Sequence, residues 1–263
     1  MSPPRIFDRA AYAKRRERAE RSGAESFLVE EAALALFERV FAAQRTFVRA
    51  LDIGSRRQSF TRLKPLAQSW VRAPLSVPET HSVGDVAVVD EECLPFANSS
   101  FDLVVSVLSL HAVNDLPGAL LQIRKLLLPD GLFVAALFGG STLLEMRRAF
   151  AAGENDTTGG ISPRVAPFAD VRDLGGLLQR AGFAMPVADI ERVTVRYGQF
   201  FTLTEDLRAI GETNALTERS LKPLRRSTLS SMLSHYATRD AEPDGRLRAT
   251  FDTIYLTGWA PPE

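Results

Sequence analysis

The chain has 263 residues, 45% of them hydrophobic, which suits one large globular domain or one domain with a cap. Its 32 basic and 32 acidic residues give a formal net charge of zero, which argues against general nucleic-acid binding. The single cysteine excludes an internal disulfide and a cysteine-built metal site, and three scattered histidines do not indicate a metal cluster.

Residues 1–45 are predicted to be an N-terminal helical segment. Residues 1–21 are charged, and their basic side chains fit either a solvated helix or a contact with an acidic partner or anionic lipid. From Ser26 the apolar residues recur at helical spacing, which predicts a core-facing helix. The sequence contains no run of about 18 apolar residues, so no membrane-spanning helix is expected. The N-terminus lacks the apolar core of a signal peptide, and its acidic residues argue against a mitochondrial transit peptide.

Residues 46–263 are predicted to form the main domain, which opens with a strand over 46–53. A loop and a helix that reaches Trp70 should follow. Residues 70–77 are compatible with a short strand, and 85–89 is a better one.

The central stretch of the chain predicts a parallel strand, helix and strand. Residues 101–110 are almost continuously apolar, which is typical of a strand covered on both faces. Asn114 or Asp115 can cap the helix that follows, and a proline is tolerated in its first turn. The sequence Pro-Asp-Gly at 129–131 predicts a turn, after which 132–138 forms a second buried strand.

The second half of the chain begins with a helix predicted from 142 to about 152 and a glycine-rich loop over 151–167. The other expected elements are helices at 171–181, 204–210 and 216–239 and strands at 187–197 and 249–259. Strands that alternate with helices and end in two late strands fit an α/β fold. Its sheet should have about seven strands, mostly parallel with an antiparallel last strand, and helices on both faces.

Several stretches match one known superfamily. LDIG at 51–54 and LLPDGLF at 127–133 occur in many class I S-adenosylmethionine-dependent methyltransferases, whereas SPRVAPF at 162–168 and GETNA at 211–215 are more specific. The sequence resembles that superfamily and, within it, the group of respiratory complex I assembly factors. It is more distantly similar to the malonyl-carrier methyltransferase of biotin synthesis. The resemblance implies the class I, Rossmann-like sheet.

The resemblance also implies that S-adenosylmethionine binds at the carboxyl ends of the first strands, as ligands generally do in open α/β sheets. The matching cofactor positions are Asp52, Gly54, Asp90, Glu91, Val107 and Leu108. In the family the first acidic residue orders the glycine loop or meets the cofactor's amine, the later acidic pair binds adenine, and the apolar positions line the other side. A carboxylate at Asp90 or Glu91 could instead cap the following loop.

Two departures from the family pattern put cofactor binding in doubt. The loop that normally carries three glycines has Arg56 and Gln58 at the second and third positions, where their side chains would crowd the cofactor. The strand end that normally supplies a carboxylate for the ribose has Pro74, and Glu79 is a nearby carboxylate. The loop could be shifted and still bind, or cofactor binding could be lost.

Two regions are candidates for substrate contact. His111 directly follows a predicted strand, where it could act as a base or positioner or be a buried histidine bonded to backbone. The loop around Gly160, Ser162 and Arg164 could contact a substrate or partner or be a simple connector. Segments of about 141–170 and 200–248 are expected to be insertions that face the substrate or partner.

The resemblance implies a protein that modifies or assists a protein partner, a subunit of respiratory complex I, and the family's mitochondrial members are linked to hydroxylation of an arginine. Hydroxylation needs an oxidant and usually iron, for which the sequence shows no evident ligand set. The alternative is a cofactor-free assembly chaperone that keeps the fold as a scaffold, and a carrier-protein methyltransferase is a weaker third reading. A cytoplasmic location is expected in a bacterium, and the mitochondrial matrix in a eukaryote.

Overall fold

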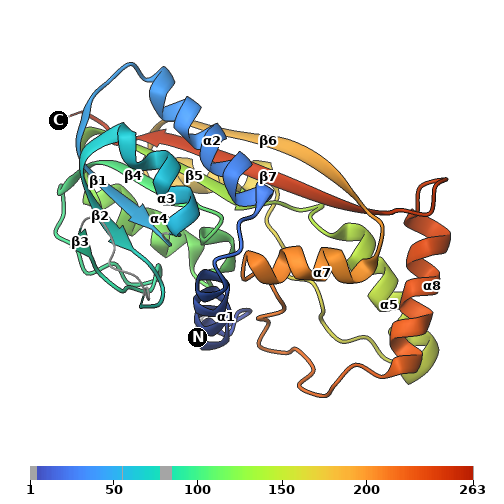
Figure 1. Cartoon of the computed structure of the whole chain (residues 1–263). Helices are drawn as coiled ribbons and strands as arrows, with labels where there is room; N and C mark the ends of the chain where they lie inside the picture. Colours follow the sequence, from blue (N-terminus) through green and yellow to red (C-terminus); the bar gives the residue numbers. More distant parts are fainter. Residues whose placement is uncertain (1–4, 55, 78–84, 263) are drawn as a thin grey trace.

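The structure is a computed structural model that describes residues 5–54, 56–77 and 85–262. Its centre is a seven-stranded sheet in the order β3-β2-β1-β4-β5-β7-β6 (Figure 1). The strands are β1 (Phe47–Ile53), β2 (Ala67–Ala73), β3 (Asp85–Val86), β4 (Phe101–Val107), β5 (Leu127–Phe138), β6 (Ala184–Tyr197) and β7 (Leu247–Trp259). Strands β1 to β5 pair in parallel, and β7 runs antiparallel to both β5 and β6. The predicted fold class is therefore confirmed.

Helices cover both faces of this sheet (Figure 1). They are α1 (Arg9–Ser22), α2 (Phe27–Ala42), α3 (Arg57–Leu63), α4 (Leu116–Leu126), α5 (Leu144–Thr158), α6 (Val171–Arg180), α7 (Phe200–Ala209) and α8 (Arg226–Asp240). One core joins the sheet to α2, α3, α5, α7 and α8, and a second core joins the opposite face to α4 and α6. Within the described ranges, none of these helices combines the length and apolarity needed to cross a membrane.

Strand β4 lies between these two cores, and this position explains its apolar sequence. All seven of its residues are buried. Leu103 and Val105 belong to one core, whereas Phe101 and Val104 belong to the other. Because successive side chains of a strand point to opposite faces, a strand covered on both sides needs no polar alternation. The predicted buried strand is confirmed, and it ends at Val107.

The helix α4 begins where the sequence predicted. The Asp115 side chain accepts a hydrogen bond from the Gly118 backbone N–H at 2.9 Å, and Pro117 lies in the first turn. This cap satisfies one of the backbone donors that a helix leaves free at its start.

The predicted helix through Trp70 is wrong at its C-terminal end. Helix α3 ends at Leu63, a short 3-10 turn containing Pro65 follows, and β2 then begins. Proline cannot supply the backbone donor that a continuing helix needs. Trp70 lies instead on β2, where its ring packs edge-on against Phe60 with centroids 5.5 Å apart.

Two predictions in the second half of the chain are also corrected. Residues 151–158, expected to open a loop, form the second half of α5, which packs against α8 (Figure 1). This packing between distant segments overrides a local composition that is poor in helix formers. Residues 216–225 were expected to be helical but contain no helix, and α8 begins at Arg226. Pro223, which cannot continue a helix, lies within this segment.

The contact between α5 and α8 depends on Gly153. A Cβ added there would lie 2.6 Å from the Met232 backbone nitrogen and 2.8 Å from its Cα. Replacing Gly153 by alanine is therefore expected to lower the free energy of unfolding by about 2 kcal/mol, as overpacking does. Urea unfolding followed by circular dichroism measures this change.

The matched control is Gly176→Ala in α6, where an added Cβ meets no atom within 4 Å. Alanine there should stabilise the protein by about 0.5–1 kcal/mol because it favours the helix. Equal effects at the two glycines would contradict the close approach of α5 and α8.

Candidate functional site

Strands β1 and β4 pair in parallel and end in two left-handed residues. Gly54 follows β1 with φ of +68°, and Leu108 follows β4 with φ of +46°. The Gly54 N–H donates to the Ala73 carbonyl at 2.9 Å, and the Leu108 N–H donates to the Ala136 carbonyl at 2.8 Å. A Cβ on Gly54 would lie 2.0 Å from Ser109 Oγ, so only glycine fits where these two turns meet.

Arg16 of α1 connects the two turns. Its Nη2 donates to the Gly54 carbonyl at 2.6 Å, and its Nη1 donates to the Leu108 carbonyl at 2.9 Å. The residue is only 5% exposed. Because a buried charge must be paired with polar groups, these carbonyls replace the water that would otherwise solvate the guanidinium. The sequence placed Arg16 in a solvated or partner-contacting helix, whereas the structure buries it.

Arg9, at the start of α1, binds the two acidic residues predicted to meet adenine. Its Nη2 donates to Asp90 Oδ1 at 2.9 Å and also to Glu91 Oε2, and its Nη1 donates to the Ala112 carbonyl at 2.9 Å. The other oxygen of Glu91 accepts from the Ser109 hydroxyl. Both carboxylate oxygens of Glu91 are therefore engaged within the protein.

Glu212, just after α7, collects four side chains from three parts of the chain. Its Oε1 accepts from the Tyr12 hydroxyl at 2.7 Å, and its Oε2 lies 3.0 Å from His111 Nε2. The guanidinium groups of Arg16 and Arg56 each lie 3.7 Å from Oε1. Arg56 also donates to a backbone carbonyl at the end of α7. We call these five residues the Glu212 cluster.

The pKa values identify the charges in the Glu212 cluster. Burial alone would raise the pKa of Glu212, but His111, Arg16 and Arg56 outweigh burial and lower it to about 2. Burial and repulsion by Arg16 lower the pKa of Arg56 to about 10. Burial and the nearby Glu212 carboxylate raise the pKa of Tyr12 above its ordinary value. At neutral pH Glu212 is thus an anion, Arg56 a cation and Tyr12 neutral.

A cavity of about 220 Å³ adjoins the Glu212 cluster. Its lining includes Tyr12, His111 and Glu212 together with apolar side chains from α5 and α7. The His111 ring also packs near the rings of Phe138 and Phe168, with centroids 5.0 and 5.7 Å away. Mostly apolar walls with a few convergent polar groups are typical of small-molecule and side-chain binding sites.

The six predicted cofactor-binding residues gather at one edge of the sheet, where Arg9 and Arg16 of α1 contact four of them. Asp52, Gly54, Glu91, Val107 and Leu108 are all buried, and Asp90 is partly buried. A cofactor could not contact the buried groups unless the atoms that cover them moved. The observed contacts show that Arg9 and Arg16 of α1 supply part of this cover.

The residues that put the cofactor in doubt behave differently from one another. Arg56 is buried in the Glu212 cluster, whereas Gln58 is turned to the start of α2, where its side chain exchanges two hydrogen bonds with the Ser26 backbone. The Gln58 side chain is thus held by the start of α2, and its effect on cofactor binding stays a prediction. Pro74 lines a cavity of about 20 Å³ beside Arg16. Glu79 lies outside the described residues.

The predicted partner loop is tied to α5. Glu154 accepts hydrogen bonds from the Ser162 backbone and hydroxyl at 2.6 Å, and from Arg164 at 2.6 and 2.8 Å. Gly160 is exposed and lines a groove of about 350 Å³ together with the 220–225 segment. Glu154 thus explains the loop's conformation, and a role in partner contact stays a prediction.

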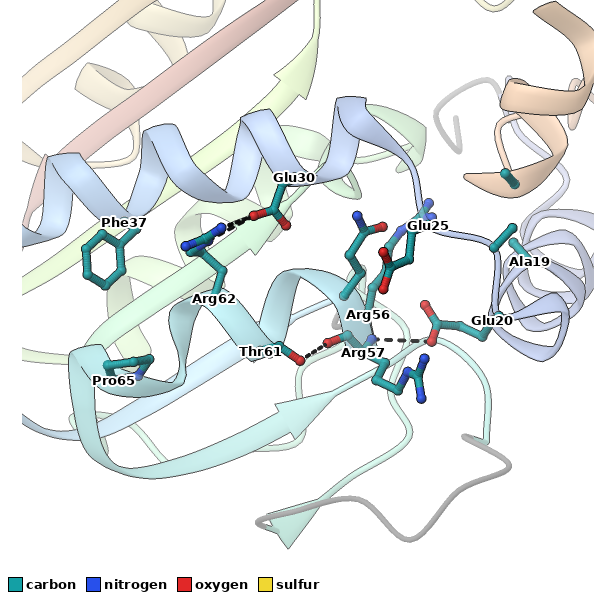
Figure 2. A pocket seen from close by; sticks show the side chains of 14 residues that line it. Ala19, Glu20, Glu25, Glu30, Phe37, Arg56, Arg57, Thr61, Arg62 and Pro65 are labelled. Atoms are coloured by element: carbon teal, nitrogen blue, oxygen red, sulfur yellow. Dashed lines mark hydrogen bonds and ion pairs between the residues drawn. The ribbon is translucent and has the colours of Figure 1, made fainter. Parts of the chain in front are cut away.

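A larger hollow of about 550 Å³ lies among α1, α2 and α3 (Figure 2). Its charged lining is largely satisfied by neighbours. Arg62 binds Glu30, and the Arg57 backbone N–H donates to Glu20 at 3.3 Å. It contains neither Glu212 nor His111, so we place the candidate site at the Glu212 cluster instead.

Tyr12, Arg16 and Glu212 are site residues that were not predicted from the sequence. Tyr12 and Arg16 lie in a charged segment with no motif, whereas Glu212 belongs to the GETNA stretch that carries the specific resemblance. That stretch was the available signal. In the described part of the chain, no three His, Cys, Asp or Glu side chains are grouped so that they could hold a metal ion.

Comparison with known proteins identifies the family of this fold. Residues 25–186 match the family model of the methyltransferase domain. Over 97% of its length the chain is 38% identical to "Arginine-hydroxylase NDUFAF5, mitochondrial" of Homo sapiens, of which it covers 76%. The protein of the same name from Danio rerio is 36% identical over 97% of the chain, which covers 83% of it. The malonyl-[acyl-carrier protein] O-methyltransferase of Nitrosospira multiformis is 33% identical over 81% of the chain and is covered to 67%.

Solved structures share the fold at low sequence identity. The Bacillus protein YcgJ superposes with a TM-score of 0.59 at 13% identity, over 88% of this chain and 99% of YcgJ. A Burkholderia thailandensis methyltransferase solved with S-adenosylhomocysteine gives 0.53 at 15% identity, over 96% and 87% of the two chains. These structures show the fold alone, whereas the family model and the relatives above show the family. The chain belongs to the methyltransferase-domain family, and its relatives there include the NDUFAF5 arginine-hydroxylases.

Proposed function

We propose that this protein acts on a protein partner during assembly of respiratory complex I. The observation that carries the proposal is the similarity to NDUFAF5 arginine-hydroxylases, which extends over 97% of the chain. The similarity to the Nitrosospira carrier-protein methyltransferase covers 81% and is lower in identity. An arginine of a complex I subunit is accordingly the proposed point of action.

The site supports this proposal through the cavity beside the Glu212 cluster. The cavity lies at the edge of the sheet where β4 ends, and one of its walls is His111. His111 Nε2 faces the Glu212 carboxylate at 3.0 Å, so Nδ1 is the ring nitrogen left to meet a partner's side chain. Among the described groups this buried Nδ1 has no hydrogen-bond partner. We propose His111 as the base or positioner for the partner's side chain.

A second candidate function is a cofactor-free assembly chaperone that uses the same fold as a scaffold. The contacts of Arg9 and Arg16 with four predicted cofactor-site residues and with the Ala112 carbonyl favour it, because they cover that site from within the chain. Both candidates share the partner and differ in whether the partner is covalently changed.

Deleting the gene in its own host tests both candidates. We expect the amount of assembled complex I, measured on native gels, to fall and to be restored by the wild-type gene. Mass spectrometry of the complex I subunits then separates the two. Loss of a one-oxygen or one-methyl mass increment on an arginine supports the enzyme. Unchanged subunit masses with impaired assembly support the chaperone, and normal complex I after deletion contradicts the proposal.

A further inference from the structure

We propose that helix α1 is an internal competitor of the cofactor, so that S-adenosylmethionine and the seated α1 exclude each other. This inference goes beyond the proposed function, and it rests on the family membership and on the contacts of α1. It explains how a chain of this family can present the cofactor-binding positions at the correct strand ends and yet cover them.

Arg16 contacts the ends of β1 and β4 at the expected cofactor site. Its guanidinium donates hydrogen bonds to the carbonyl oxygens of Gly54 and Leu108. These residues are two of the positions at which the family binds its cofactor. Carbonyl oxygens that converge on one point suit a cationic donor, and S-adenosylmethionine carries an ammonium group with three such donors. Arg16 and the cofactor's ammonium would therefore use the same acceptors.

Arg9 contacts the other end of the expected cofactor site. It binds Asp90 and Glu91, the two carboxylates expected at the adenine end of the site. Glu91 has a side chain that is 1% exposed, so its carboxylate is closed to any ligand while Arg9 and Ser109 hold it. Two arginines two helical turns apart thus engage both ends of one binding site.

Helix α1 is attached to the rest of the protein outside the two main cores. Its apolar contacts form a small cluster separate from the two main cores, namely Phe7, Tyr12, Ala112, Ala215 and Leu216. The rest of its attachment is polar and includes an ion pair between Asp8 and Arg219. The helix ends at Gly23, whose left-handed conformation separates it from α2. Displacing α1 would open the site without exposing either main core, as is typical of elements with low local stability.

Competition of this kind lowers the apparent affinity of the cofactor by the fraction of molecules in which α1 is displaced. If that fraction is on the order of 1%, the apparent affinity falls about 100-fold. Removing one anchor of the helix should recover a measurable part of this loss. Arg16 is the appropriate anchor because it contacts both strand ends.

Isothermal titration of the full chain with S-adenosylmethionine tests the proposal. We expect Arg16→Ala to bind at least about tenfold more tightly than the wild type. The matched control is Arg18→Ala, an exposed arginine of the same helix, which should bind as the wild type does. Equal or weaker binding by a folded Arg16→Ala protein overturns the proposal, as does the absence of binding by every folded variant at millimolar cofactor.

A second variant and a second measurement apply if Arg16→Ala does not fold. Arg9→Ala removes the outer anchor, and the same gain in affinity is expected of it. In the wild type, saturating S-adenosylmethionine should accelerate hydrogen exchange of the amides of Arg9–Ser22. Unchanged or slower exchange in the cofactor complex overturns the proposal. Neither measurement depends on complex I. The competition between α1 and the cofactor is therefore tested independently of the proposed function.

Discussion

Replacing Glu212 by alanine is expected to lower the free energy of unfolding by about 3–5 kcal/mol at neutral pH. The carboxylate lies within 4 Å of Arg16, Arg56 and His111 and accepts a hydrogen bond from Tyr12. Without it, two buried guanidinium groups face each other with no anion between them. Removing one partner of a buried ion pair is costly because the remaining charge stays desolvated. Urea unfolding measures the loss.

The control for this substitution is Glu205→Ala, an exposed glutamate on the neighbouring helix α7, which should change stability by less than about 0.5 kcal/mol. A loss of similar size at both positions would contradict the assignment of Glu212 as the anion that holds the site together.

The same residue predicts a pH dependence. The pKa of Glu212 falls from its ordinary value of 4.5 to about 2 in the folded protein. A folded-state pKa below the unfolded value means that the stabilisation is fully present above about pH 5 and is lost as the pH falls towards 2. We therefore expect a Glu212→Gln protein to lose less stability than the wild type over this interval. Parallel pH profiles for the two proteins would contradict the shift.

Gly54→Ala is expected to destabilise the fold by about 3 kcal/mol. The added Cβ would lie 2.0 Å from Ser109 Oγ, and alanine is strained at a φ of +68°. The left-handed conformation costs about 1–2 kcal/mol, and overpacking costs about as much again. A change in the backbone conformation at residue 54, or a shift of β1 away from Ser109, would displace the residue 54 carbonyl from Arg16 and weaken the attachment of α1. Thermal unfolding and hydrogen exchange of α1 measure the two effects.

Gly159→Ala separates conformation from packing. Gly159 has φ of +67°, yet an added Cβ would meet no atom within 4 Å. Alanine there should cost only about 1 kcal/mol, with no change in the exchange of α1. If Gly54→Ala cost no more than this control, the close approach of β1 and β4 would be refuted.

The central strands and the helix α4 could be predicted because their local sequence favours the same structure that their place in the fold requires. The apolar run of β4 and the Asp115 cap of α4 each specify one structure, and the structure has both. The second half of α5 was not predicted, because Gly153 is a poor helix former. Its helical conformation depends on packing against Met232, which is far away in the sequence. Long-range packing of this kind leaves no local pattern to find.

The candidate site was predicted only in part, for a related reason. The strand ends were found because the family keeps a recognisable sequence at Asp52, Gly54 and Asp90. The contribution of α1 was not found, since a basic helix looks the same in sequence whether its arginines face water or buried carbonyls. Only the fold shows that Arg16 points inward.

Hydrogen exchange of α1 in the free protein tests this account most directly. Tyr12 and Arg16 are buried and bonded across the site, but α1 is attached outside both main cores. The amides of Arg9–Ser22 should therefore exchange more slowly than those of an unstructured peptide and faster than those of α2. Exchange at the rate of an unstructured peptide would show that α1 does not occupy the strand ends, and would contradict the account.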